Sequence, residues 1–167
     1  MNAIDLVVSA LETSREWAVG PARDMADKPL CQPTPNGGNH PTWVMAHLAV
    51  SEGGFLEIMT GEPSPAAKWK DTCGQGTEPT TDPDDYPSLE EAIELFSRLR
   101  DRTIEFVGKQ TVDDLGKPPM HVPPQLAKFD TFQTLGNLLN VVTLHTAVHI
   151  GQLCDARRAN GRKPSVA

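Results

Sequence analysis

The chain has 167 residues, 38% of them hydrophobic, and a formal net charge of -7. A chain of this length can bury one core of ordinary size, so we expect a single domain over residues 1–167. The acidic balance, with no basic helical face, argues against a nucleic acid or an anionic membrane surface as partner. No stretch approaches the roughly 18 apolar residues that cross a bilayer, and the first residues lack the basic start of a signal peptide. We therefore expect a cytoplasmic protein.

The spacing of apolar residues predicts an all-α protein with four amphipathic helices. In the first helix, Ile4, Leu11 and Ala18 share one stripe. The connections between the helices are rich in proline and glycine, and alternating strand patterns are almost absent. The predicted helices cover about residues 2–19, 41–60, 89–108 and 131–159.

Residues that begin or end helices set the expected boundaries of the first two. Gly20-Pro21 is expected to stop the first helix, since proline lacks the N–H that the next turn needs. Asn39 is the expected N-cap of the second helix, with Pro41 in its first turn, and Gly61 should close it.

The last two helices carry similar signals. Ser88 opens the third with a capping-box pattern that places Glu91 three residues later. Asp130 or Thr131 is the expected N-cap of the fourth, and Gly161 follows its end.

Four long helices favour a four-helix bundle. The connection over residues 61–87 is far longer than antiparallel neighbours need, and at roughly 3.3 Å per extended residue it can run the length of a bundle. We therefore expect a long crossover that leaves helices two and three parallel. Residues 109–130 form a second long, proline-rich connection, and long ordered loops often cover a functional site.

The stretch LHTAVHIGQL, residues 144–153, places His145 and His149 one helical turn apart. Side chains at i and i+4 share a face with Cβ atoms roughly 5–6 Å apart, so two imidazoles can converge on one ion at about 2.1 Å. A third ligand is available in His47, on the apolar side of the second helix, if the second and fourth helices run antiparallel. Three histidines leave positions open for water or substrate, as in catalytic sites.

A plainer interpretation is that these histidines are ordinary core residues, and the spacing alone leaves both interpretations open. A zincin protease is excluded because Thr146 stands where the glutamate general base should follow the first histidine. No catalytic base is assigned, because no Asp or Glu lies one turn from the three histidines. Gln152, Trp43 and Ser51 are expected near the same site, since their spacing places them beside His149 or His47.

The combination of NHPTWVMAHLAVSE in the second helix with HTAVHIGQLCDARRANGRKP at the end of the fourth resembles the DinB-like, or YfiT-like, superfamily of metalloproteins. The resemblance covers about residues 2–164. It implies a four-helix bundle of up-down-down-up topology and a divalent ion, nickel or zinc, bound by His47, His145 and His149. It also implies a homodimer, by analogy with related proteins.

The activity that this resemblance implies is broader than one reaction. Relatives include transferases and isomerases that use low-molecular-weight thiols such as bacillithiol or mycothiol, and metal-dependent hydrolases. We expect a metal-dependent transferase that uses such a thiol and acts on a small-molecule substrate. The alternatives are a metal-dependent hydrolase and a non-catalytic stress protein that binds a metal or a small ligand.

Overall fold

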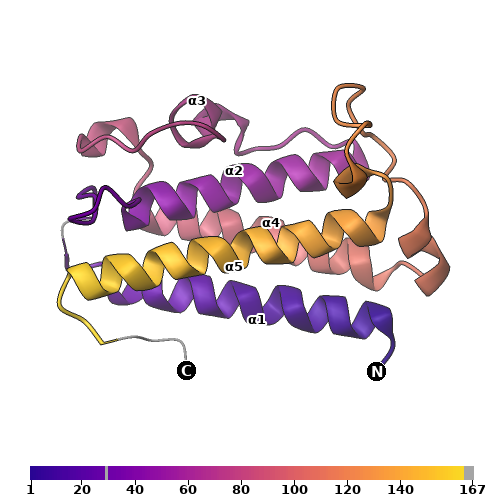
Figure 1. Ribbon diagram of the computed structural model, residues 1–167, viewed down its shortest axis with the longest axis horizontal. Coiled ribbons are helices and arrows are strands. Elements are labelled where there is room, and N and C mark those ends of the chain that lie inside the picture. The colour runs from indigo at the N-terminus through magenta and orange to yellow at the C-terminus, as the bar shows by residue number, and fades with distance from the viewer. Residues whose placement is uncertain (29, 164–167) are drawn as a thin grey trace.

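The computed structural model describes residues 1–28 and 30–163, which form an all-helical bundle with no strand in those two ranges (Figure 1). This confirms the predicted fold class. None of the helices in the described ranges is both long and apolar enough to cross a membrane. The long helices are α1 (Ala3–Asp24), α2 (Pro41–Thr60), α4 (Leu89–Gly108) and α5 (Leu135–Ala159). The connections contain the one-turn helix α3 (Lys70–Cys73) and 3-10 turns at Ala67–Trp69, Pro83–Asp85, Val112–Gly116 and Asp130–Phe132.

The order and direction of the helices confirm the expected topology. In Figure 1, α1 and α2 run in opposite directions, the connection that contains α3 returns along the bundle, α4 runs parallel to α2, and α5 runs back. Both α4 and α5 pack against α1 and α2, so α4 and α5 occupy opposite corners of the bundle. Because α2 and α5 are antiparallel neighbours, the N-terminal half of α2 lies level with the C-terminal half of α5.

The apolar stripes of the four long helices meet along the bundle axis. Leu11 of α1, Leu48 of α2, Phe96 of α4 and Leu139 of α5 are at most 1% exposed. At about 25 cal/mol per Å² of apolar surface, side chains of this size each contribute roughly 1.5–3 kcal/mol when fully buried. This burial holds together the helices that carry the site described below.

The prediction that α1 ends before Gly20-Pro21 is wrong. The helix continues to Asp24 with Pro21 inside it. Ala18 and Ala22 are fully buried, and so is Met25, whose N–H bonds to the Ala22 carbonyl at 3.1 Å. Packing of this last turn against the core outweighs the one helical hydrogen bond that proline removes.

The predicted N-cap of α2 is also wrong, since His40 and not Asn39 caps the helix. His40 Nδ1 accepts a hydrogen bond from the Trp43 N–H at 3.1 Å, and its Nε2 lies 3.1 Å from the Thr80 carbonyl oxygen, to which it donates. The ring is fully buried, and burial lowers the pKa of His40, so the neutral imidazole is favoured. A neutral imidazole at this position joins α2 to the crossover.

The start of α4 agrees with its sequence signal, whereas that of α5 does not. The capping box at Ser88 is present. The helix α5 begins at Leu135, with Thr134 as its N-cap, and neither Asp130 nor Thr131 caps it. Those two residues lie in the 3-10 turn Asp130–Phe132 that precedes the helix, whereas the Thr134 side chain accepts from the Asn137 N–H at the start of α5.

Candidate metal centre

Three imidazoles meet where α2 passes α5. His47 comes from α2, while His145 and His149 come from successive turns of α5. The Nε2 atom of His145 lies 3.1 Å from that of His47 and 3.2 Å from that of His149. Within the described part of the chain, these three residues form the only group of three or more His, Cys, Asp or Glu side chains placed to hold an ion. Antiparallel packing of α2 and α5 brings together the residues that the sequence analysis singled out.

The Nδ1 atoms of His47 and His149 point away from the cluster and are hydrogen-bonded to acceptors, which sets the tautomers of these two rings. His47 Nδ1 lies 2.7 Å from the Cys73 carbonyl oxygen, so this nitrogen carries the proton and donates. His149 Nδ1 lies 2.8 Å from Gln152 Oε1, which also accepts from Asn39 Nδ2 at 3.1 Å. With the proton on Nδ1, each ring presents an unprotonated Nε2 to the centre of the cluster.

Burial keeps the three rings neutral. His47 and His149 are 5% and 7% exposed, and His145 is half-buried. Burial, followed by the neighbouring His149, His47 and Arg100, lowers the pKa of His145 to about 3. Burial, followed by His47, lowers the pKa of His149 to about 4, and burial also lowers the pKa of His47. At neutral pH all three lone pairs are therefore available to an electron acceptor.

The spacing of the nitrogens fits a divalent cation. His145 Nε2 lies 3.1 and 3.2 Å from two unprotonated nitrogens, so either it carries the His145 ring proton and donates to one of them, or a cation lies between the three atoms. Two nitrogens bound to one ion at about 2.1 Å lie roughly 3.0–3.4 Å apart for angles of about 90–109° at the ion. Imidazole is a ligand that zinc, nickel and copper accept readily. The donor set thus suits such an ion and leaves coordination positions open.

The other predicted pocket residues lie beside the histidines. The Trp43 ring stacks on His47, with centroids 4.6 Å apart and planes 7° apart, and its Nε1–H donates to Thr77 Oγ1 at 3.2 Å. Ser51 Oγ lies 3.4 Å from His47 Nε2, at the edge of the cluster. Gln152 contacts His149 directly, as described above. Trp43 thus forms one wall, and Ser51 offers a hydroxyl to whatever the cluster binds.

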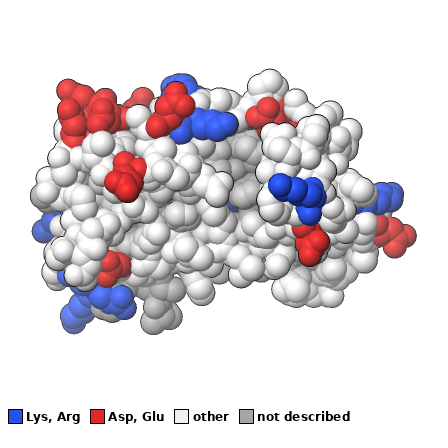
Figure 2. Space-filling view, turned by 45° about the horizontal axis from the view of Figure 1, so that its top comes forward, with Lys and Arg blue, Asp and Glu red and all other residues white. Residues whose placement is uncertain are grey.

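One face of the molecule is hollowed, and a cavity lies beside Gln152. Figure 2 shows a hollow near the middle of one face, with charged side chains above it and uncharged surface below it. Leu144 and Val148 of α5, which adjoin the histidines in sequence, are 56% and 64% exposed. A cavity of about 370 Å³ lies beside Gln152 and is also lined by Asn39 and Asp155. The cavity adjoins the cluster through Gln152, the hydrogen-bond partner of His149, and none of the three histidines lines it.

Two residues that hold the site in place, Cys73 and Asn39, were missed in the sequence analysis. Cys73 acts through its backbone carbonyl, which no sequence pattern reveals, and it reaches His47 because the crossover folds back over α2. Asn39 had been assigned to the N-cap of α2. Its contact with Gln152 depends on the distant α5, so no local signal could have indicated it.

The fold and the histidine cluster define a helical-bundle protein with a candidate metal centre. The family described as the DinB superfamily matches residues 10–153, and the chain therefore belongs to that superfamily. This confirms the resemblance inferred from the two helical motifs. No functionally curated protein matches the sequence.

Among solved structures, the chain is similar to YfiT from Bacillus subtilis, with a TM-score of 0.68 and 20% sequence identity. The match covers 98% of this chain and 91% of that one. YfiT is described as a probable metal-dependent hydrolase with an unusual four-helix bundle topology. At this level of identity, the similarity establishes the fold that the two proteins share.

Proposed function

We propose that His47, His145 and His149 bind one divalent ion, nickel or zinc, and that the protein is a metal-dependent enzyme acting on a small molecule. The observation that supports this is the convergence of three Nε2 atoms, with neighbouring distances of 3.1 and 3.2 Å. Hydrogen bonds from Nδ1 to the Cys73 carbonyl and to Gln152 orient two of the rings, as is usual for metal-binding histidines.

The reaction that we propose is substitution on an electrophile by a low-molecular-weight thiol: the S–H proton is lost to water, a sulfur–carbon bond forms, and the bond to the leaving group, a halide in the test below, breaks. A divalent ion bound here would lower the pKa of a coordinated thiol and keep it as the nucleophilic thiolate. The three neutral imidazoles add no negative charge, so the protein ligands do not offset the charge of the ion. In this proposal Trp43 limits access of water from one side, and the Ser51 hydroxyl donates a hydrogen bond to the substrate.

The test of this proposal is adduct formation by protein loaded with nickel or zinc. Bacillithiol, mycothiol or cysteine would be mixed with an activated aryl halide, and the thioether product measured by mass spectrometry. We expect product with the wild type and only the uncatalysed amount with His149→Ala. Absence of product with every thiol, although the ion is bound, would contradict the transferase.

A second candidate is a metal-dependent hydrolase, which the description of the structurally similar YfiT favours. The two activities are separated by omitting the thiol. A hydrolase is expected to turn over activated esters or amides in the absence of thiol, and to stop when the ion is removed by a chelator. Binding of the ion with neither activity would instead favour a protein that binds a metal or small ligand without catalysis.

A further inference from the structure

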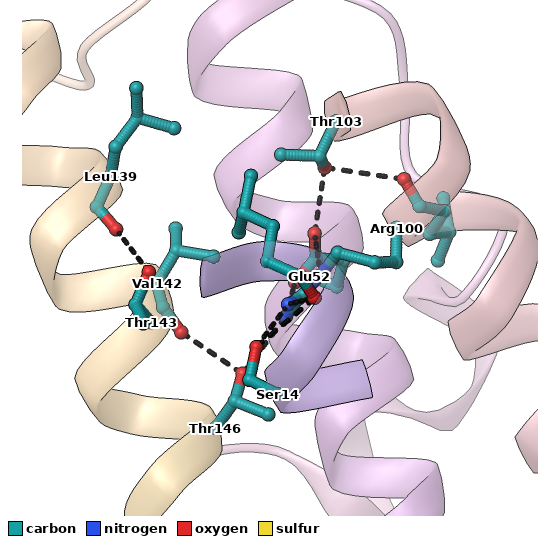
Figure 3. Close-up of polar contacts among 10 residues, drawn as sticks. Ser14, Glu52, Arg100, Thr103, Leu139, Val142, Thr143 and Thr146 are labelled. Atoms are coloured by element: carbon teal, nitrogen blue, oxygen red, sulfur yellow. Dashed lines mark hydrogen bonds and ion pairs between the residues drawn. The ribbon is translucent and has the colours of Figure 1, made fainter. Parts of the chain in front are cut away.

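A second cluster of polar side chains lies inside the bundle (Figure 3), and one of its members, Thr146, directly follows His145 in the chain. At its middle is Arg100 of α4, whose side chain is 0% exposed. The guanidinium donates from Nε and Nη2 to Glu52 at 2.9 and 2.8 Å, and from Nη1 to the Leu11 carbonyl and Ser14 Oγ at 3.0 and 2.8 Å. A fifth hydrogen bond joins Nη2 to Thr146 Oγ1 at 2.9 Å. All five donors of the guanidinium are therefore used.

Stability by itself is a weak reason for this cluster. Glu52, whose side chain is 3% exposed, accepts from Arg100 and also from Thr103 Oγ1 at 2.7 Å. Removing two charges from water costs several kcal/mol, and apolar side chains of similar volume often stabilise a core as well or better. The position of the cluster, between the helices that carry the three histidines, offers a second reason.

Arg100 joins the two helices that carry those histidines. Its Nη2 atom donates both to Glu52 Oε2 on α2 and to Thr146 Oγ1 on α5, so one nitrogen bridges the two helices. Thr146 directly follows His145 in the chain, and its own hydroxyl proton is used on the Val142 carbonyl at 3.0 Å. Since α4 and α5 occupy opposite corners of the bundle, the side chain of Arg100 reaches across the interior to make this contact.

The separation of α2 and α5 decides the geometry of the histidine cluster. The distance between His145 and His149 is set within one helix. The distance from either residue to His47 depends on how closely α2 approaches α5. We propose that Arg100 is a positioning residue which, through Glu52 and Thr146, holds α2 and α5 at the spacing that an ion bound by the three histidines requires. This inference rests on the proposed metal centre.

Two variants that remove one hydrogen bond each from the same guanidinium test this role. Thr146→Val keeps the shape of the side chain and removes the acceptor on α5, next to the histidines. Ser14→Ala removes an acceptor on α1, which carries no histidine of the cluster. A purely structural role predicts similar effects on ion binding in both variants. Thr146→Ser, which retains the hydroxyl, is the conservative control.

The measurement is the Kd for zinc or nickel, obtained by competition with a chelating dye, together with the visible spectrum of the Co²⁺-loaded proteins. We expect the Kd of Thr146→Val to rise about tenfold, the lower end of the range for residues that orient metal ligands, and its Co²⁺ bands to shift. Ser14→Ala and Thr146→Ser should stay within about twofold of the wild type, with unchanged bands. That pattern supports the proposal.

Equal Kd values for Thr146→Val and Ser14→Ala, while the wild type binds tightly, would overturn the positioning role and leave the metal centre intact. Failure of the wild type to bind any ion would instead overturn the metal centre itself. If Thr146→Val does not fold, Thr146→Ala takes its place, because the smaller side chain leaves room for a water at Arg100 Nη2. The Kd values of Thr146→Ala and Ser14→Ala are then compared in the same way, and equal values would overturn the positioning role.

Discussion

The two polar clusters between α2 and α5 differ in whether each hydrogen-bond donor or acceptor has a partner. In the Arg100 cluster each guanidinium donor has an acceptor within 3.0 Å. In the histidine cluster, the ring protons of His47 and His149 point outward, and their unprotonated Nε2 atoms lie 3.1 and 3.2 Å from the single Nε2 atom of His145. One proton on His145 Nε2 can satisfy only one of its two neighbours, so at least one buried acceptor of the cluster lacks a donor from the three rings, and a cation bound between them would satisfy it. The comparison teaches that the first cluster is complete by itself and the second is prepared for a ligand.

The largest expected effect comes from removing the charge at the middle of the Arg100 cluster. Arg100→Met would leave Glu52 buried without its countercharge, at a cost of about 3–5 kcal/mol in the free energy of unfolding. Urea denaturation measures this change. The double variant Arg100→Met/Glu52→Gln should recover much of the loss, because no unpaired charge remains. If Arg100→Met were as stable as the wild type, Glu52 would not depend on Arg100 for its buried charge.

Removing one imidazole should abolish stoichiometric ion binding. We expect near one divalent ion per wild-type chain and loss of that ion in His149→Ala, with a drop in affinity of more than about 100-fold, beyond the effect of residues that only orient ligands. Elemental mass spectrometry of untagged protein measures the content. His121→Ala is the matched control, since this exposed histidine lies in the connection before α5. An ion retained by His149→Ala would place the metal elsewhere.

A smaller effect is expected for the residue that orients His149. Gln152→Leu removes the acceptor of the Nδ1–H, so the ring can turn or change tautomer, and affinity should fall about tenfold. Gln152→Glu keeps an acceptor oxygen at this position and should bind the ion at least as well as the wild type. Titration calorimetry with nickel or zinc compares the two variants. Equal affinities for Gln152→Leu and wild type would exclude this orienting role.

The smallest change is expected with pH in the metal-free protein. Burial lowers the pKa of His149 to about 4, so below about 6.5 the unfolded chain takes up protons that the folded chain does not. The free energy of unfolding is therefore highest above about pH 6.5 and falls as the pH is lowered towards 4. From pH 7 to pH 6 the loss should be on the order of 1 kcal/mol.

Urea midpoints measured with a chelator present test this dependence. The slope should be shallower in His149→Ala, which lacks one of the buried imidazoles. An unchanged midpoint between pH 7 and pH 5 would mean that the folded and unfolded chains take up the same number of protons, and would contradict a lowered pKa for these rings.

The four long helices could be predicted because each has its own apolar stripe, and the capping box at Ser88 is likewise a local feature. Helix ends were predicted less well. Pro21 lies inside α1 because Ala22 and Met25 bury the last turn, and His40 caps α2 because Thr80 from the crossover holds its ring. Contacts with distant segments decide these ends, and local propensity does not record them.

Some features of the candidate site likewise depend on local sequence, and others depend on contacts between distant segments. The spacing of His145 and His149 required only a helix, whereas the role of Asn39 depends on α5. Arg100 had a signal that was not used: it falls on the stripe that contains Phe96 and Thr103, and a charged residue on a buried stripe indicates an internal partner. Its partner Glu52 could not be identified without the packing of α2 against α4.

Some expectations stay predictions: the single domain, the homodimer, the cytoplasmic location and the absence of nucleic-acid or membrane partners. The sequence by itself determined the helices, the crossover and the pair of histidines on one face of α5, because these depend on periodicity and chain length. Only the tertiary structure decided that His47 meets that pair, that Cys73 and Gln152 set the tautomers, and that Arg100 bridges α2 and α5. Those features depend on contacts between residues far apart in the chain, and such contacts exist only once the bundle has formed.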